Sequence, residues 1–111
     1  MVAVSGKERL HIVLHGTVQG MGFRPTIYRI AQKLHLAGWV RNADGGIEIE
    51  VEGRTEQLET FLRLLQSERP RAAVVATQQI VRMVPQQSAW FEIVPSEQRE
   101  DFRTPPGVSP D

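Results

Sequence analysis

A glycine-rich turn between a strand pattern and a helix pattern constrains this chain more than any other stretch. The turn reads Gly16-Thr17-Val18-Gln19-Gly20-Met21-Gly22-Phe23-Arg24 and is followed by Pro25. An alternating apolar segment leads into it, and an apolar set at helical spacing leads out of it: Leu10, Ile12 and Leu14, then Phe23, Ile27, Ile30, Ala31 and Leu34. The stretch therefore predicts a strand, a tight turn and a helix in direct succession.

A turn of this kind favours anion binding. The first turn of a helix offers unpaired backbone N–H groups and the positive end of the helix dipole. Glycines let the backbone adopt positive φ and approach a ligand closely. Arg24 adds a planar guanidinium that can bind two phosphate oxygens at once. These features predict a phosphate site, and the alternative is a glycine-rich turn beside an ordinary surface arginine.

The composition narrows the class of partner. The 111 residues suffice for one two-layer domain. Basic and acidic side chains number 13 each, so no bulk charge attracts nucleic acid or an anionic membrane. With no cysteine, a disulfide framework, a thiolate zinc site and cysteine nucleophilic chemistry are excluded. No stretch has the apolar character of a signal peptide or a membrane span. We therefore expect a cytoplasmic, soluble domain that binds neither membrane nor nucleic acid.

The remaining pattern predicts the order of the elements. We expect, in turn, a flexible lead-in at 1–8, a strand at 9–16, a helix at 23–36, strands at 39–42 and 47–52, a helix at 55–66, a strand between 73 and 84, and a short strand at 90–94. Gly38 is expected as the left-handed stop of the first helix, and Thr55 as the N-cap of the second. The proline-rich residues 95–111 are expected to form a linker toward a missing downstream region.

This order predicts an α+β fold. It is the ferredoxin-like split βαβ sandwich, βαββαβ plus a short final strand, with two helices on one face of an antiparallel sheet. In the strand at 47–52, apolar residues for the core alternate with acidic residues expected to be solvated: Ile47, Ile49 and Val51, then Glu48, Glu50 and Glu52. An acidic open face argues against RNA binding, which needs aromatic and basic side chains there. Trp39 and Trp90 are assigned to core or sheet-edge packing rather than to stacking on a ligand.

Three motifs together resemble the signature of the acylphosphatase family. They are the glycine-rich turn, Gly38-Trp39-Val40-Arg41-Asn42, and Gly46-Ile47-Glu48-Ile49-Glu50-Val51-Glu52-Gly53. The match covers residues 9–94 in the family's order and spacing. The resemblance implies a small enzyme that hydrolyses acyl phosphates to a carboxylate and inorganic phosphate, without a metal or organic cofactor. It also implies a role for each matched residue: a phosphate cradle made by Gln19, Gly20, Met21, Gly22 and Phe23, charge supplied by Arg24, and a water positioned by Asn42. Met21 stands where the family commonly has valine.

Two further features resemble one branch of that family. Pro25 after Gly22-Phe23-Arg24 is similar to the N-terminal domain of the hydrogenase maturation carbamoyltransferases of the HypF type, and the tail at 105–111 resembles the junction in those proteins that precedes a cysteine-rich zinc-finger segment. That resemblance implies carbamoyl phosphate as the substrate and downstream domains of the same longer chain as partners. The product would serve the cyanide ligands of nickel-iron hydrogenase. Two alternatives stay open, namely a free-standing acylphosphatase and a non-catalytic domain that binds or docks carbamoyl phosphate.

The implied reaction needs few side chains. The leaving group is a carboxylate, whose conjugate acid has a pKa of about 4, so it departs without a general acid. The remaining tasks are to stabilise charge on the phosphoryl oxygens, assigned to Arg24 and the turn, and to orient water, assigned to Asn42. No residue of the motifs is an obvious base. We expect an unprotonated phosphate oxygen to take the water's proton, with His15 beside the turn as the alternative.

Overall fold

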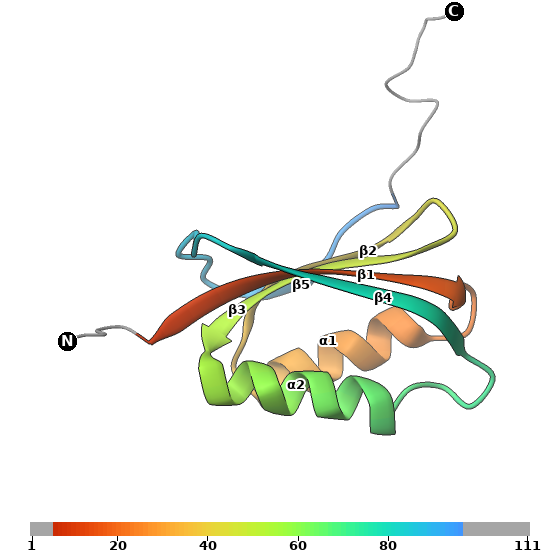
Figure 1. The fold of residues 1–111 in the computed structure, drawn as a ribbon, viewed down its shortest axis with the longest axis horizontal. Coiled ribbons are helices and arrows are strands. Elements are labelled where there is room, and N and C mark those ends of the chain that lie inside the picture. The colour runs from red at the N-terminus through yellow and green to blue at the C-terminus, as the bar shows by residue number, and fades with distance from the viewer. Residues whose placement is uncertain (1–5, 97–111) are drawn as a thin grey trace, which may run out of the picture.

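The computed structural model of the chain describes residues 6–96, so most of the predicted lead-in and nearly all of the predicted linker lie outside the described residues. Within this range the chain forms β1 (Lys7–Thr17), α1 (Phe23–Lys33), β2 (Ala37–Ala43), β3 (Gly46–Arg54), α2 (Thr55–Ser67), β4 (Val74–Met83) and β5 (Phe91–Ile93). Both helices pack on the same face of the sheet (Figure 1). The element order confirms the predicted split βαβ sandwich.

The strands lie in the order β4-β1-β3-β2-β5. The first four pair antiparallel, with β1 between β3 and β4 and with β2 on the far side of β3. The short β5 pairs parallel to β2, so the sheet is mixed rather than wholly antiparallel as predicted. Because β4 and β5 lie at opposite edges, the chain between them crosses one end of the sheet (Figure 1).

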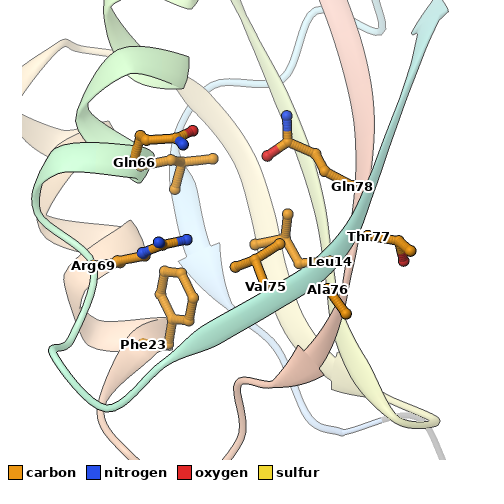
Figure 2. A pocket seen from close by; sticks show the side chains of 9 residues that line it. Leu14, Phe23, Gln66, Arg69, Val75, Ala76, Thr77 and Gln78 are labelled. Atoms are coloured by element: carbon orange, nitrogen blue, oxygen red, sulfur yellow. The ribbon is translucent and has the colours of Figure 1, made fainter.

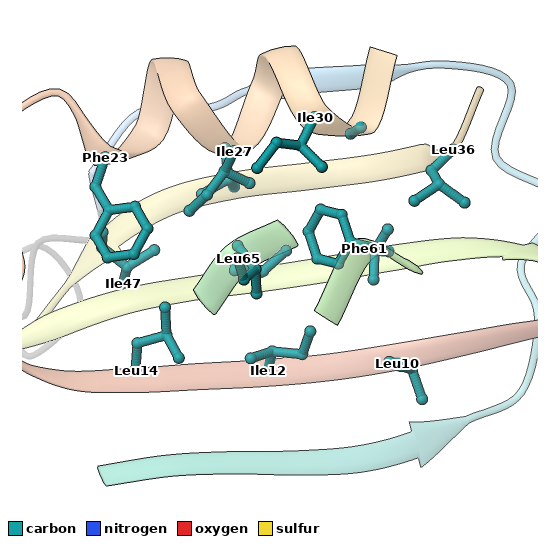
Figure 3. Close-up of a cluster of buried hydrophobic side chains, with 14 of the residues drawn as sticks. Leu10, Ile12, Leu14, Phe23, Ile27, Ile30, Leu36, Ile47, Phe61 and Leu65 are labelled. Atoms are coloured by element: carbon teal, nitrogen blue, oxygen red, sulfur yellow. The ribbon is translucent and has the colours of Figure 1, made fainter. Parts of the chain in front are cut away.

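One hydrophobic core fills the space between the sheet and the helices (Figure 3). The inward residues of β1 and β3 are buried as the alternation predicts, and Ile12 and Ile49, which face each other in register, are fully buried. From the helix side, Ile27 and Phe61 have no exposed surface. Burial of each such side chain stabilises the fold by about 1.5–3 kcal/mol. This core fixes the β1–α1 turn at one end of the sheet.

Helix α1 ends three residues earlier than predicted, and Gly38 is not its stop. His35 takes the left-handed conformation instead, with φ 58°. The N–H of Leu36 donates to the carbonyl of Ala31 at 2.9 Å and the N–H of His35 to that of Gln32 at 3.1 Å, which is a Schellman motif. Gly38 lies inside β2, with φ 130°, where a Cβ would stand 2.0 Å from the carbonyl oxygen of Glu50. Close approach of strands, rather than helix termination, requires this glycine.

The N-cap of α2 is also shifted by one residue from the prediction. Arg54 occupies the N-cap position, and Thr55 is the first helical residue. The N–H of Arg54 donates to Oε1 of Gln57 at 3.2 Å. This bond joins the N-cap N–H to a glutamine side chain three residues later, which is one half of a capping box.

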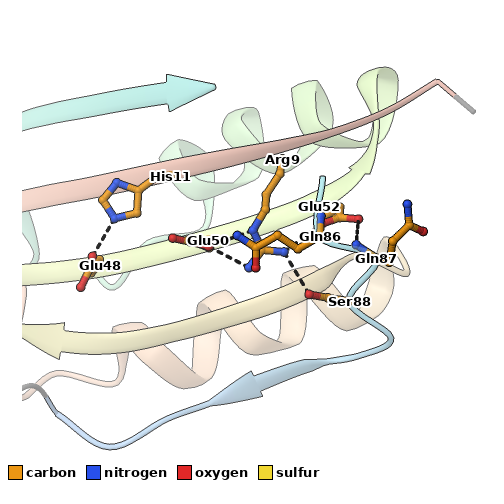
Figure 4. Close-up of polar contacts among 8 residues, drawn as sticks. All are labelled: Arg9, His11, Glu48, Glu50, Glu52, Gln86, Gln87 and Ser88. Atoms are coloured by element: carbon orange, nitrogen blue, oxygen red, sulfur yellow. Dashed lines mark hydrogen bonds and ion pairs between the residues drawn. The ribbon is translucent and has the colours of Figure 1, made fainter. Parts of the chain in front are cut away.

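The acidic residues of β3 are not the wet face that the alternation predicts (Figure 4). Glu52 is 2% exposed and Arg9, its register partner on β1, is 1% exposed. The Arg9 guanidinium donates to Glu52 at 2.9 Å and to Glu50 at 2.8 Å. Glu48 pairs with His11 and Arg41. Strand alternation gives the face of a residue but not what neighbouring strands place beside it, so the sequence alone missed these pairs.

The two tryptophans lie toward the β2 and β5 side of the sheet. Trp39 is half-buried on β2, and the Arg41 guanidinium stands 4.8 Å from its ring centroid. Trp90 precedes β5 and is 66% exposed, so it is at the sheet edge and outside the core. Among residues 6–96, no helix is long and apolar enough to cross a membrane.

Candidate phosphate-binding site

The turn between β1 and α1 is held at both ends by buried side chains. Val18 is 1% exposed and Phe23 is 2% exposed, and both belong to the core. Between them the chain turns through Gly20 and Gly22, with φ 77° and 82°. No atom lies within 4 Å of a Cβ built at either glycine. The two glycines are therefore required by their backbone angles, which L side chains rarely adopt, and the space beside them is open.

The start of α1 leaves donors unused. The first hydrogen bond of the helix runs from the N–H of Thr26 to the carbonyl of Gly22 at 3.2 Å, and the Thr26 hydroxyl donates to the same oxygen at 3.1 Å. Within residues 6–96, no backbone hydrogen bond is made by the N–H groups of residues 20–24. Pro25 occupies the first turn, where its missing N–H removes no bond. The turn thus presents backbone donors at the positive end of the helix dipole.

Gln19 performs a task that the sequence did not reveal. Its side-chain Nε2 donates to the carbonyl of Ala43 at 2.7 Å and to that of Gly46 at 2.8 Å. These carbonyls flank the β2–β3 turn, 24 and 27 residues away along the chain. Gln19 is expected as a member of the cradle through its backbone N–H, and its side chain in addition ties the turn to the hairpin.

Asn42 is the second-last residue of β2, directly before Ala43, and lines the same hollow as Gln19. The hollow has a volume of about 200 Å³ and is lined by Gln19, Asn42, Ala43, Asp44, Gly45 and Ser96. Within the described chain, Oδ1 of Asn42 is buried and has no hydrogen-bond partner. A buried acceptor without a partner costs free energy, so the site suits a donor from outside the chain, such as a water molecule.

Arg24 and His15 lie near the turn but do not line this hollow. The Arg24 side chain is half-buried in the first turn of α1 and has no ion-pair or hydrogen-bond partner among residues 6–96. His15 is exposed at the β1 end of the turn. Its ring lies against Gly46, where a Cβ would stand 3.1 Å from the ring carbon Cδ2. The structure therefore brings Gln19 and Asn42 into one hollow. Arg24 lies outside this hollow, in the first turn of α1.

A ferredoxin-like sandwich whose first strand-to-helix turn offers free backbone donors beside an arginine has the features that favour binding of an anion such as a phosphoryl group. Comparison with known proteins narrows this class. The acylphosphatase family model matches residues 10–93. An acylphosphatase of Methanospirillum hungatei is 44% identical over 69 residues, which is 61% of this chain and 76% of that protein. The chain belongs to the acylphosphatase family, whose members hydrolyse acyl phosphates.

Relatives of a second kind are much longer. Carbamoyltransferase HypF2 of Cupriavidus necator is 45% identical over 67 residues, which is 60% of this chain and 8% of that protein. The crystal structure of full-length HypF in its phosphate- and nucleotide-bound form superposes with a TM-score of 0.79 and 35% identity, over 84% of this chain and 12% of that one. Both free acylphosphatases and HypF proteins are therefore similar to this chain, as the sequence motifs predicted.

Proposed function

We propose that this chain hydrolyses acyl phosphates at the β1–α1 turn, with the phosphoryl group bound by the backbone N–H groups of residues 19–23 and by Arg24. The free donors at the start of α1 support the cradle. Arg24 supports it through its unpaired guanidinium, which is half-buried and one residue from the turn. Charge that spreads over the phosphoryl oxygens in a loose transition state is stabilised by such fixed donors.

Asn42 positions the attacking water in this proposal. The observation that carries this assignment is the buried, unpartnered Oδ1 of Asn42, a residue that lines the same hollow as Gln19. A water that donates one hydrogen to Oδ1 keeps a lone pair free for attack on phosphorus. Because Gln19 joins the turn to the hairpin, the water and the phosphate are held in a fixed relative position.

The proton balance closes without a side-chain base. Water attacks phosphorus, the bond from phosphorus to the acyl oxygen breaks, and the electron pair leaves with the carboxylate. A phosphate oxygen takes the proton of the water, so the products are carboxylate and inorganic phosphate. The carboxylate needs no protonation because its conjugate acid is strong, with a pKa of about 4.

Carbamoyl phosphate is the acyl phosphate that we propose as the physiological substrate. The similarity to carbamoyltransferases HypF2 and HypF supports this choice. In this proposal the chain works with downstream domains of a longer protein that prepares the cyanide ligands of nickel-iron hydrogenase. A free-standing acylphosphatase with broad acyl tolerance is the alternative, supported by the similarity to the Methanospirillum enzyme.

The proposal is tested by release of inorganic phosphate from carbamoyl phosphate and from benzoyl phosphate. We expect turnover with both, and a loss of at least about a hundredfold in Arg24→Ala, the usual cost of removing a charge-stabilising donor. Arg29→Ala, on the exposed side of the same helix, is the matched control and should keep normal activity. Phosphate binding that needs Arg24, without turnover of either substrate, would show a binding domain instead and would overturn the hydrolytic role.

A further inference from the structure

A small hollow lies at the β5 edge of the sheet, between β2 and the segment that leads into β5. Its volume is about 200 Å³, and its lining includes Trp39, Ser88, Trp90 and Glu92. We refer to it as the β2–β5 hollow. None of these four residues lines the hollow of Asn42 or has a role in the proposed hydrolysis.

The register of β2 and β5 places a tryptophan beside a glutamate. Trp39 is the register partner of Glu92. Their chain neighbours Val40 and Phe91 are buried in the core between the sheet and the helices. Because successive side chains of a strand point to opposite faces, Trp39 and Glu92 lie on the face of the sheet that the helices leave open (Figure 1).

The second tryptophan of the hollow is exposed, and the backbone that carries it is held in place. Trp90 is 66% exposed, and its carbonyl accepts a 2.9 Å hydrogen bond from the N–H of Gly38. Two residues earlier, the Ser88 hydroxyl accepts a 3.0 Å hydrogen bond from the Arg9 guanidinium. Two bonds thus tie this segment to the sheet, so a partner can contact the indole of Trp90 at little cost in backbone freedom.

Another hollow, between α2 and β4, differs in this respect (Figure 2). Its volume is about 260 Å³, but Leu14 and Phe23 in its lining are 1% and 2% exposed. The core already covers their apolar surface, so this surface is not available to a ligand. The β2–β5 hollow, in contrast, keeps most of one indole side chain open to a partner.

Glu92 gives the β2–β5 hollow a negative charge. Its carboxylate is exposed and has no hydrogen-bond or ion-pair partner among residues 6–96. The arginines nearby on the same face are paired with carboxylates of β3, Arg9 with Glu50 and Arg41 with Glu48. The hollow therefore combines an uncompensated carboxylate with two indole rings.

We infer that the β2–β5 hollow binds an alkylguanidinium group, as in the side chain of an arginine. A planar guanidinium stacks on an indole and donates two parallel hydrogen bonds to a carboxylate, which assigns the stacking to Trp90 and the charge to Glu92. The chain already contains one such contact, since the Arg41 guanidinium stands 4.8 Å from the Trp39 ring centroid. The sequence alone favoured packing for Trp90, whereas this inference gives it a ligand.

Other ligands fit the hollow less well. Glu92 repels an anion, and an ammonium lacks the planar fork that matches both carboxylate oxygens. The volume of about 200 Å³ is below that of a drug-sized site, which limits the ligand to the end of one side chain or a molecule of similar size. The inference goes beyond the proposed function, because binding in this hollow requires no turnover.

The test uses the peptide acetyl-Gly-Arg-Gly-amide, with citrulline in place of arginine as the uncharged counterpart, in ¹H–¹⁵N correlation spectra of the full chain. We expect saturable shifts of the indole N–H signals of Trp39 and Trp90 with the arginine peptide, and none with the citrulline peptide. Glu92→Gln should weaken binding by at least about tenfold, the effect of losing a charge-assisted hydrogen bond. Trp90→Ala should weaken it by about threefold or more, the effect of losing an exposed cation–π contact. Glu59→Gln, exposed on α2, should leave it unchanged.

Three outcomes would overturn the inference. Equal binding of the citrulline peptide would show that the hollow does not recognise the charge. Equal binding of a lysine peptide would show that the planar fork is not required. Full affinity in Glu92→Gln would place the peptide elsewhere. Glu92 and Trp90 are both exposed, so their substitution leaves the core intact, and unchanged backbone signals of the core strands would verify this.

Butylguanidinium separates the two sources of the group. Tighter binding of the arginine peptide would identify an arginine of a partner polypeptide, and tighter binding of butylguanidinium would identify a small free cation. Either result supports a guanidinium site in the hollow. Arg24→Ala should keep this binding, so failure of the proposed hydrolysis and failure of this inference are distinguishable.

Discussion

The side-chain amide of Gln19 donates a 2.7 Å hydrogen bond to the carbonyl of Ala43, the residue that follows Asn42. The same nitrogen donates to the carbonyl of Gly46 at 2.8 Å, so one side chain joins the β1–α1 turn to both sides of the β2–β3 turn. In the proposed reaction the first turn binds the phosphoryl group, and Asn42, which holds water, lies on β2 just before the second turn. The relative position of the two reactants therefore depends on Gln19.

Removal of this connection should lower the rate more than the affinity. For Gln19→Ala we expect kcat to fall by about ten- to a hundredfold, because small displacements of reacting groups have effects of this size. The KM for benzoyl phosphate should change little, since the backbone donors and Arg24 remain. Steady-state kinetics measures both constants. Gln32→Ala, on the exposed side of α1, serves as the control, and a variant Gln19→Ala with unaltered kcat would exclude the positioning role.

Gly22 and Gly38 should respond differently to alanine. At Gly22 the backbone angle is unfavourable for alanine but no atom obstructs a Cβ, so Gly22→Ala should cost about 1–2 kcal/mol of stability and impair phosphate binding. At Gly38 a Cβ would stand 2.0 Å from the Glu50 carbonyl oxygen, so Gly38→Ala should destabilise the sheet further. Urea unfolding of the two variants gives the comparison. Equal free energies of unfolding would contradict the expectation that the close contact at Gly38 costs more stability than the backbone angle at Gly22.

The buried pair of Arg9 and Glu52 should contribute strongly to stability. Glu52→Ala leaves the Arg9 guanidinium with Glu50 and the Ser88 hydroxyl and removes the acceptor of the Gln86 and Gln87 N–H groups. We expect a loss of about 3 kcal/mol in the free energy of unfolding, the lower range for a broken buried pair. Glu59→Ala, exposed on α2, should change stability little. Urea denaturation at neutral pH measures the free energy of unfolding of both variants. Equal losses in the two variants would mean that the buried pair of Arg9 and Glu52 contributes no more to stability than an exposed glutamate does.

Stability should also fall in acid. Burial raises the pKa of the Glu52 carboxyl, but the Gln86 N–H, the Arg9 guanidinium and the Gln87 N–H outweigh it and hold this pKa below the usual 4.5. A lowered pKa in the folded state stabilises the fold above the unfolded value, and this contribution is lost as pH falls below about 4.5 toward the folded value. Urea unfolding between neutral pH and acid should show this decline, with a shallower slope in Glu52→Ala. An identical slope in both proteins would assign the decline to other groups, such as Glu48, whose pKa is also lowered.

The rate of hydrolysis should not depend on a histidine. If a phosphate oxygen takes the proton of the water, His15→Ala keeps the pH dependence of kcat seen in the unsubstituted chain. The exposed position of His15 at the edge of the hairpin agrees with this expectation. Loss of an ionisation near neutral pH in the variant would instead identify His15 as the base.

The order of elements was predictable because it depends on local periodicity. The alternation at Leu10, Ile12 and Leu14 and the glycine-rich turn after it identify β1 and the start of α1 without any tertiary information. The end of α1 was not predictable, because His35, and not a glycine, takes the positive φ that terminates the helix, and positive φ is uncommon for residues other than glycine.

Contacts between segments were the part that the sequence could not supply. Gln19 and the hairpin carbonyls are separated by 24 and 27 residues, and the Arg9–Glu52 pair by 43. Such bonds follow from the register of the sheet, which a single sequence does not determine. The motifs pointed to Asn42, but only the structure revealed its unpartnered oxygen. The cytoplasmic location and the linker after residue 94 stay predictions.

The most direct test of the account is the hydrolysis of benzoyl phosphate by Asn42→Ala, with kcat and KM measured separately. If Asn42 orients the attacking water over a phosphate already bound by the turn and Arg24, kcat should fall by at least about a hundredfold while KM stays close to that of the unsubstituted chain. A normal kcat in Asn42→Ala, with the fold intact by circular dichroism, would contradict the account and remove Asn42 from the chemistry.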